Sequence, residues 1–283
     1  MLGPARADDS SGVLRTQDVI YGRKVGVALT MDVFQSKQRH KGIGIISLVS
    51  GGWISNHDEI TSNSGAIFLD RGYTVFMVVH GSQPKFTIPE AIQDIHRAVR
   101  FIRHNAAEWG VDPNHLGITG GSAGGHLSLI LGTQGGPGAP DAKDPIDRES
   151  SAVQAVACFY PPSDFLNYGA DGEDAVGVGR LAHYRPAFGL DSDSPEGRQR
   201  LGREISPYNF ITAAMPPTLI VHGDADATVP LQQSERFVRH AVEMGAIARL
   251  VIVPGAGHGQ QYMTGKKVLI ADWFDQYLRG IRP

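Results

Sequence analysis

The 283-residue sequence contains a single cysteine, Cys158, which excludes a disulfide within the chain. Cys158 lies in the apolar run 153–160, so we expect it to be a small buried hydrophobe. No stretch approaches the roughly 20 apolar residues that span a bilayer. Lysine and arginine (26) nearly balance aspartate and glutamate (29), giving a formal net charge of −3. This balance gives no reason to expect nucleic acid or an anionic membrane as a partner.

Sequence patterns typical of metal and nucleotide sites are also missing. There is no Cys-x-x-Cys or His-Glu-x-x-His pattern, and the 11 histidines are dispersed. There is no Gly-x-Gly-x-x-Gly after the first predicted strand and no Walker-type loop. We therefore expect no metal and no cofactor. Oligomeric state cannot be derived from these patterns.

The chain consists largely of alternating strand-like and helix-like segments. This alternation predicts an α/β fold with a mostly parallel, doubly wound sheet covered by helices on both faces. The first two strands are expected to be antiparallel, around a turn at 23–26. The predicted strands cover residues 19–21, 28–34, 43–49, 73–79, 116–119, 153–160, 218–221 and 248–253. The predicted helices cover residues 59–71, 89–109, 126–131, 231–244 and 266–278.

Two segments depart from this alternation. Residues 162–214 are rich in Gly, Asp, Ser and Pro and contain no convincing buried strand, so we expect a lid-like insertion or pocket wall above the sheet. Residues 1–18 are expected to form a flexible tail ahead of a single domain over 19–283. The alternative is a trimmed secretory signal, because Ala5-Arg6-Ala7 before Asp8-Asp9 resembles a cleavage site. A cytoplasmic or a secreted or periplasmic location therefore both fit a soluble chain.

The most informative segment is Gly120-Gly121-Ser122-Ala123-Gly124-Gly125. A short apolar run enters it and a helical pattern leaves it, as in the strand, sharp turn and helix of a nucleophile elbow. A serine held in a strained turn needs neighbours without side chains, because the strand and helix must approach closely. The segment predicts that Ser122 is a nucleophile.

A serine nucleophile needs a base and an acid that orients the base. His258, flanked by glycines after the strand at 248–253, is the predicted base. Asp226 and Asp224 both follow the strand at 218–221, and we favour Asp226, because Asp224 lies where it could brace the turn. The chain order Ser122, Asp226, His258 is that of α/β-hydrolase triads. His126 and His222 are expected to pack or to hydrogen-bond.

An oxyanion hole needs backbone N–H groups where negative charge develops. The N–H of Ala123, directly after the nucleophile, is one predicted donor. Gly51 and Gly52 follow the strand at 43–49 and are the others. Trp53 and Ser50, which flank these glycines, are expected to contact the substrate.

On these motifs the chain resembles the α/β-hydrolase superfamily, in particular small esterases and acetyl esterases with His-Gly-Gly-Gly-Trp-type loops. The resemblance extends from Val19 onward and implies that Ser122 is the nucleophile, Asp226 the acid and His258 the base. It also implies oxyanion donors at Gly51, Gly52 and Ala123. The segments that carry it are Ser50–Trp53, 94–125, 222–230 and 257–259.

One departure from the family pattern concerns the oxyanion loop. Val49-Ser50 stands where the family has His-Gly, and that histidine normally braces the loop. We hypothesise that Ser50 either braces the turn or contacts the substrate.

The resulting function hypotheses belong to different classes. The leading one is a serine carboxylesterase that cleaves short-chain acyl esters, such as acetylated or feruloylated carbohydrates, through an acyl-enzyme. An amide hydrolase, such as an arylformamidase or a small peptidase, is the alternative. A hydrolase-fold binding protein without catalysis is a third.

Overall fold

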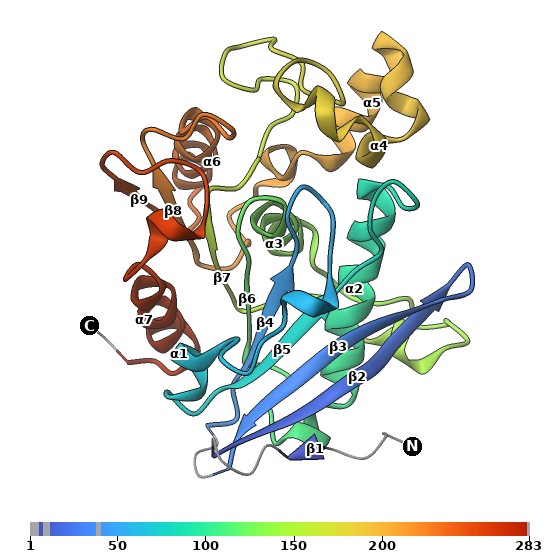
Figure 1. Cartoon of the computed structure of the whole chain (residues 1–283), viewed down its shortest axis with the longest axis vertical. Coiled ribbons are helices and arrows are strands. Elements are labelled where there is room, and N and C mark those ends of the chain that lie inside the picture. The colour runs from blue at the N-terminus through green and yellow to red at the C-terminus, as the bar shows by residue number, and fades with distance from the viewer. Residues whose placement is uncertain (1–5, 8–11, 38–40, 282–283) are drawn as a thin grey trace.

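The computed structural model describes residues 6–7, 12–37 and 41–281. Nine strands form one sheet in the order β1-β2-β3-β5-β4-β6-β7-β8-β9 (Figure 1). The strands β1, β2 and β3 pair in antiparallel fashion, as do β3 and β5, and all pairs from β5 to β9 are parallel. The strands are β1 (Arg6–Ala7), β2 (Val13–Lys24), β3 (Val27–Ser36), β4 (Gly44–Val49), β5 (Thr74–Val79), β6 (Leu116–Thr119), β7 (Ala155–Phe159), β8 (Thr218–Gly223) and β9 (Ala248–Val253).

Helices cover both faces of the sheet, which confirms the predicted fold class (Figure 1). Side chains of α2, α3 and α6 belong to one apolar core, and those of α1 and α7 belong to a second core on the opposite face. The interior strands contribute to both cores: in β4, Ile46 and Leu48 face one, and Ile45 and Val49 face the other. The helices are α1 (Ala66–Leu69), α2 (Ile88–His104), α3 (Ala123–Gln134), α4 (Arg185–Phe188), α5 (Pro195–Ile205), α6 (Gln232–Glu243) and α7 (Lys267–Leu278).

The long helix α2 begins and ends where its sequence predicts. Glu90 accepts a hydrogen bond from the Thr87 amide at 2.7 Å, and Pro89 lies in the first turn, where a missing N–H costs nothing. After α2, a 3-10 turn at Ala106–Trp109 ends at Gly110, which has a φ of 60°. The predicted helix over 89–109 is therefore divided in two.

The predicted helix over 59–71 is wrong for most of its length. Apart from Glu59, which ends a 3-10 turn at His57–Glu59, only α1 is helical there, and it begins after Gly65, whose φ of 77° is left-handed. The preceding residues form turns instead, because the Ser64 hydroxyl accepts from the Thr61 amide at 2.9 Å. This shortened helix leaves part of the sheet on the α1 and α7 face without a helical cover.

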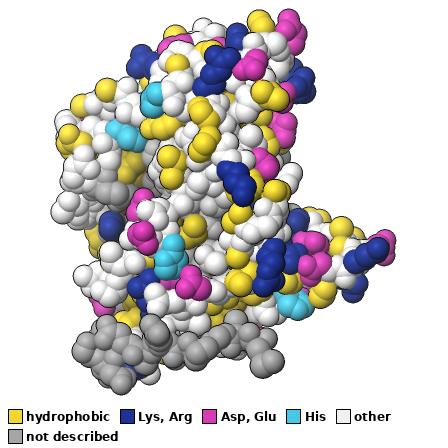
Figure 2. Space-filling model, turned by 45° about the vertical axis from the view of Figure 1, so that its right-hand side comes forward, with side chains coloured by type: hydrophobic (Ala, Val, Ile, Leu, Met, Phe, Trp, Pro, Cys, Tyr) yellow, Lys and Arg dark blue, Asp and Glu magenta, His cyan; other side chains and the backbone are white. Residues whose placement is uncertain are grey.

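Residues 13–18 of the predicted flexible tail lie in a strand, because β2 begins at Val13 and pairs with β3 along its length. The β2–β3 hairpin projects from the body of the molecule (Figure 1), and basic and acidic side chains are interspersed over the face drawn in Figure 2. Most of the predicted cleavage site (Ala5, Asp8 and Asp9) lies outside the described residues. The division into a tail and a single domain stays a prediction.

Residues 162–214 contain no strand, as expected, and fold into short helices that include α4 and α5. These helices lie above the carboxyl ends of the central strands (Figure 1). Cys158 is buried in β7, as predicted, and burial raises the pKa of its thiol. Within the described ranges, no helix combines the length and the apolar character needed to cross a membrane.

Candidate active site

Ser122 lies in a tight turn between β6 and α3. Its φ of 54° and ψ of −120° fall in a region that side chains disfavour. A Cβ at Gly120 would overlap the Gly124 carbonyl, and a Cβ at Gly125 would lie 2.8 Å from the Phe159 carbonyl oxygen. The Ser122 amide donates to that same oxygen at 3.0 Å. The glycines therefore allow the close contact that holds Ser122 at the end of β6.

The structure brings Ser122, His258 and Asp226 together. Nε2 of His258 lies 2.9 Å from Oγ of Ser122, and Nδ1 of His258 lies 2.7 Å from Oδ2 of Asp226. An ionised carboxylate only accepts hydrogen bonds, so Nδ1 carries the proton and the lone pair of Nε2 faces the Ser122 hydroxyl. This arrangement is the one that proton transfer from serine requires.

The surroundings of Asp226 keep its carboxylate charged. Oδ1 accepts from the amides of Thr228 and Val229 at 2.9 Å, and Oδ2 lies 3.3 Å from Nε2 of the buried His222. Burial by itself would raise the pKa of Asp226, but hydrogen bonds from His222, His258 and the Val229 amide hold that pKa well below its usual range. His222 therefore has the hydrogen-bonding position that was expected of it.

The competing carboxylate, Asp224, has a different place. Its Oδ1 accepts from the Gly255 amide at 2.6 Å and so ties the loop after β8 to the loop after β9. A further contact was not found from the sequence: the buried Tyr160 ring lies 4.6 Å, centre to centre, from the His258 ring. The sequence signal for this contact was an aromatic residue directly after β7, at the same sheet edge as the other site residues.

The predicted oxyanion loop is a tight turn, with φ values of 56° at Gly52 and 58° at Trp53. Gly51 and Ile54 exchange two hydrogen bonds of 2.9 Å each. The Gly51 N–H is thus committed to the Ile54 carbonyl, which corrects its prediction as an oxyanion donor. The Gly51 carbonyl accepts from Ile54 in return, and the Gly52 N–H, on the other side of that trans peptide, is directed away from the turn.

Two of the three predicted donors remain unpaired. Within the described residues, the amides of Gly52 and Ala123 have no hydrogen-bond acceptor. Ala123 is the first residue of α3, where the helix dipole adds partial positive charge. These two amides are the groups that could stabilise an oxyanion beside Ser122.

Trp53 does not have the predicted place in the site. Its side chain is 3% exposed, and its Nε1 donates to Nδ1 of His126 at 3.2 Å. Burial lowers the pKa of His126 to about 4, so His126 is neutral, as an acceptor must be. Trp53 therefore anchors the oxyanion loop to the insertion, because three aromatic rings of the insertion surround it: Phe165, Tyr184 and Phe188.

Ser50 braces the loop through a histidine that the sequence did not reveal. Nδ1 of His80 donates to the Gly81 carbonyl at 2.8 Å, so its Nε2 accepts from the Ser50 hydroxyl at 2.8 Å. Burial lowers the pKa of His80 to about 4, which keeps the ring neutral. Between the two hypotheses for Ser50, the geometry favours the brace. The sequence signal for this brace was a histidine directly after β5, the strand beside β4.

The same segment after β5 holds the loop at other points. Nε2 of Gln83 donates to the Gly52 carbonyl at 2.6 Å, and the Gln83 amide donates to the Trp53 carbonyl at 3.2 Å. The Ser55 hydroxyl, which accepts from the His80 amide at 3.2 Å, donates in turn to the Val49 carbonyl. Residues 80–83 thus provide the bracing that the usual histidine would supply from position 49.

Away from this site, and within the described ranges, Asp18, Asp32 and His57 place three potential metal ligands within 4.8 Å of one another. The Arg15 guanidinium already donates to the buried Asp32 carboxylate at 2.7 Å. This positive charge opposes a cation at the same place. The group ties the β2–β3 hairpin to the loop after β4.

With this geometry established, the comparisons with known proteins identify the relatives. Residues 31–240 match the BD-FAE family. The chain belongs to that family. Esterase LipC of Mycobacterium tuberculosis is 29% identical over 93% of this chain and 66% of its own length. Esterase LipQ of the same organism is 26% identical over 86% of this chain and 52% of its own length. The chain therefore spans between about half and two thirds of these curated relatives.

One solved structure matches this chain over nearly the whole length of both. A truncated carbohydrate esterase from gut microbiota covers 98% of this chain and is itself fully covered, with 26% identity and a TM-score of 0.79. The fold of this BD-FAE chain is the α/β-hydrolase fold. The family resemblance drawn from the sequence motifs is confirmed.

Proposed function

We propose that this chain is a serine carboxylesterase that cleaves short-chain acyl esters, with Ser122, His258 and Asp226 as its catalytic triad. The observation that carries the proposal is the continuous hydrogen-bond chain from the Ser122 hydroxyl through His258 to Asp226, at 2.9 and 2.7 Å. The esterase names of the relatives support the same reaction class. A binding protein without catalysis would not need these triad hydrogen bonds to be intact.

In the proposed reaction, Nε2 of His258 takes the Ser122 proton as Oγ attacks the ester carbonyl carbon. The charged Asp226 carboxylate holds the imidazole in the required tautomer and stabilises the imidazolium. His258 then gives the proton to the leaving alkoxide, which departs as an alcohol. A water molecule, deprotonated by His258, then attacks the acyl-enzyme; His258 returns that proton to Oγ of Ser122 as the carboxylic acid leaves.

The developing oxyanion is assigned to the amides of Gly52 and Ala123, which point to no acceptor in the described chain. Such preorganised donors stabilise the tetrahedral intermediate more than the planar substrate, and each contributes about 3 kcal/mol in comparable sites. The insertion helices α4 and α5 are the proposed pocket wall, and Tyr184 packs directly against Gly52.

The proposed substrates are small natural esters, with acetylated or feruloylated carbohydrates as the preferred class. The similarity to a carbohydrate esterase supports this choice. Amide hydrolysis remains the alternative, because an uncharacterized peptidase of Bacillus subtilis is 26% identical over 59% of this chain. Cytoplasmic and exported locations also remain alternative proposals.

A substrate panel on the wild type and Ser122→Ala tests the proposal. The panel contains nitrophenyl acetate, acetylated and feruloylated sugars, and N-formylkynurenine. We expect hydrolysis of the acyl esters, with turnover lowered by about 10⁶-fold in Ser122→Ala. Preferential cleavage of N-formylkynurenine would favour the amide hydrolase. If a fluorophosphonate fails to label Ser122 in the wild type, the catalytic proposal is wrong.

A further inference from the structure

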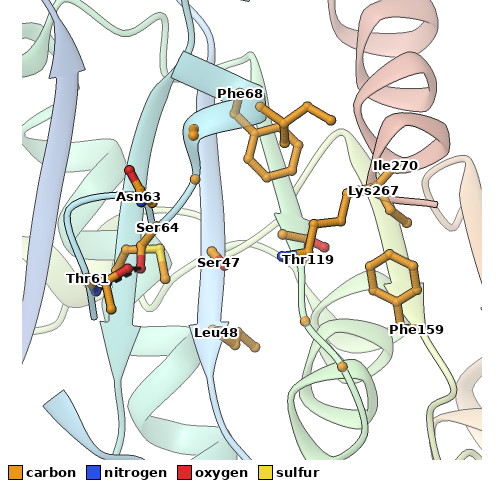
Figure 3. A pocket seen from close by; sticks show the side chains of 16 residues that line it. Ser47, Leu48, Thr61, Asn63, Ser64, Phe68, Thr119, Phe159, Lys267 and Ile270 are labelled. Atoms are coloured by element: carbon orange, nitrogen blue, oxygen red, sulfur yellow. Dashed lines mark hydrogen bonds between the residues drawn. The ribbon is translucent and has the colours of Figure 1, made fainter. Parts of the chain in front are cut away.

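A cavity of about 570 Å³ lies on the α1 and α7 face of the sheet (Figure 3). Its volume falls within the range of small-molecule sites. None of Ser122, His258 and Asp226 lines it, although Gly120 and Gly121 do. The cavity exists because the helix α1 is short, so residues 61–65 pass over the sheet as a loop rather than as a packed helix.

The floor of the cavity is polar where a buried sheet is normally apolar. Ser47 of β4 and Thr119 of β6 are direct neighbours in the parallel register. Two residues earlier on the same face, Ile45 and Gly117 pack against the core and the Phe274 ring. The side-chain pattern therefore changes from apolar to hydroxyl at the cavity.

These two hydroxyls have no hydrogen-bond partner among the described residues; Thr119 is only 6% exposed, whereas Ser47 is half-buried. Neither hydroxyl is sealed in the core, since both face the cavity, so each is free to bond an oxygen or nitrogen atom that enters it. The lining also supplies the Asn63 amide.

One cation completes the lining. Lys267 is the first residue of α7, and in Figure 3 its side chain extends from the helix over the sheet toward Thr119. Lys267 is exposed to solvent, and its ammonium has no ion-pair partner in the described chain. No side chain caps the amino end of α7, where the helix dipole is positive. The remaining wall combines the polar Thr61 and Ser64 with apolar residues that include Phe68, Met77 and Ile270.

We propose that this cavity is a binding site for a small monocarboxylate with a short apolar tail. The carboxylate is held by the Lys267 ammonium and by the hydroxyls of Ser47 and Thr119, while the tail packs against Phe68 and Ile270. A single cation in the lining matches the charge of a carboxylate and leaves a dianionic phosphate half neutralised. The proposal does not depend on hydrolysis, because the catalytic groups take no part in it.

Butyrate is the probe, titrated by calorimetry or NMR into the Ser122→Ala protein, so that catalysis does not contribute. We expect saturable binding with a Kd of about 1 mM, which is reasonable for a ligand of this size. Lys267→Met and Thr119→Val should each raise the Kd by about 5-fold or more, because each removes one polar contact. Butyramide, which is uncharged, should bind more weakly.

Two control variants separate this site from others. Lys266→Met removes the neighbouring lysine, which does not line the cavity, and should leave the Kd unchanged. Thr119→Ser keeps the hydroxyl and should retain binding. The proposal is overturned if butyrate does not saturate, or if the Kd stays the same in both Lys267→Met and Thr119→Val. Equal binding of inorganic phosphate would also contradict it, because the site is assigned to a monoanion.

Discussion

The loops that meet at Ser122 are held in place in two different ways. The acid and base loops, after β8 and β9, support one another: Asp226 is fixed by amides of its own loop, and Asp224 ties this loop to Gly255. The oxyanion loop is fixed from outside, by residues 80–83 and by the aromatic rings of the insertion. A triad can thus be specified by local chemistry, whereas the direction of an oxyanion amide depends on distant segments.

The largest expected effect on kcat comes from substituting Asp226, the proposed acid of the triad. Asp226→Asn should lower kcat by about 10⁴-fold, because an amide cannot hold His258 in the tautomer that accepts the serine proton. Ester turnover, measured alongside a thermal melt, checks this. Asp224→Asn is the matched control and should keep kcat within a few-fold of the wild type, as Asp224 only braces the loop. Equal losses in the two variants would reverse the assignment of the acid.

The oxyanion loop provides a second matched pair. Gly52→Ala should lower kcat by about 10²-fold or more, because its φ is 56° and a Cβ would overlap the Tyr184 ring. Gly51→Ala should keep near wild-type kcat, since nothing lies within 4 Å of its added Cβ and its amide is already bonded. A severe loss in Gly51→Ala with the fold intact would restore Gly51 as an oxyanion donor.

The external brace should have a smaller effect. Ser50→Ala removes the donor to His80 and should lower kcat by about 5-fold with KM nearly unchanged, since a lost hydrogen bond of this kind is worth about 1 kcal/mol. Ser50→Thr keeps the hydroxyl and should recover part of the loss. Unchanged turnover of every ester by Ser50→Ala would remove the brace from the account.

As the pH falls, we expect the brace that neutral His80 gives to the oxyanion loop to be lost before the Asp226 carboxylate is protonated. Burial lowers the pKa of His80 from 6.5 to about 4. The unfolded chain therefore binds a proton first, and the stability that neutral His80 contributes is complete above about pH 6.5 and is lost between about pH 6.5 and 4. The low pKa of Asp226 keeps its carboxylate charged over this range. Urea unfolding at pH 7 and 4.5 should show a smaller acid loss for His80→Gln than for the wild type. An equal loss would contradict this cause.

Much of the fold was predictable because buried strands and amphipathic helices leave regular apolar patterns. The strands at 116–119 and 248–253 match their predictions residue for residue. The prediction of a helix over 59–71 failed because the Ser64 hydroxyl accepts from the Thr61 backbone amide and Gly65 is left-handed, effects that a count of apolar residues does not detect. The same wrong prediction meant that the sequence did not reveal the cavity on the α1 and α7 face, because that cavity forms where no helix covers the sheet.

Taken alone, the amino-acid order singled out the residues to which we assign the chemistry: a glycine-framed serine, an acid and a histidine, each following a buried strand. These are local features, fixed by the side chains and by the backbone freedom of their neighbours. The tertiary structure decided which backbone amides are free to act as donors and which side chains hold them in place. It committed the Gly51 amide to Ile54, buried Trp53 and recruited His80, because hydrogen-bond directions between distant segments are set only when the strands have assembled into the sheet.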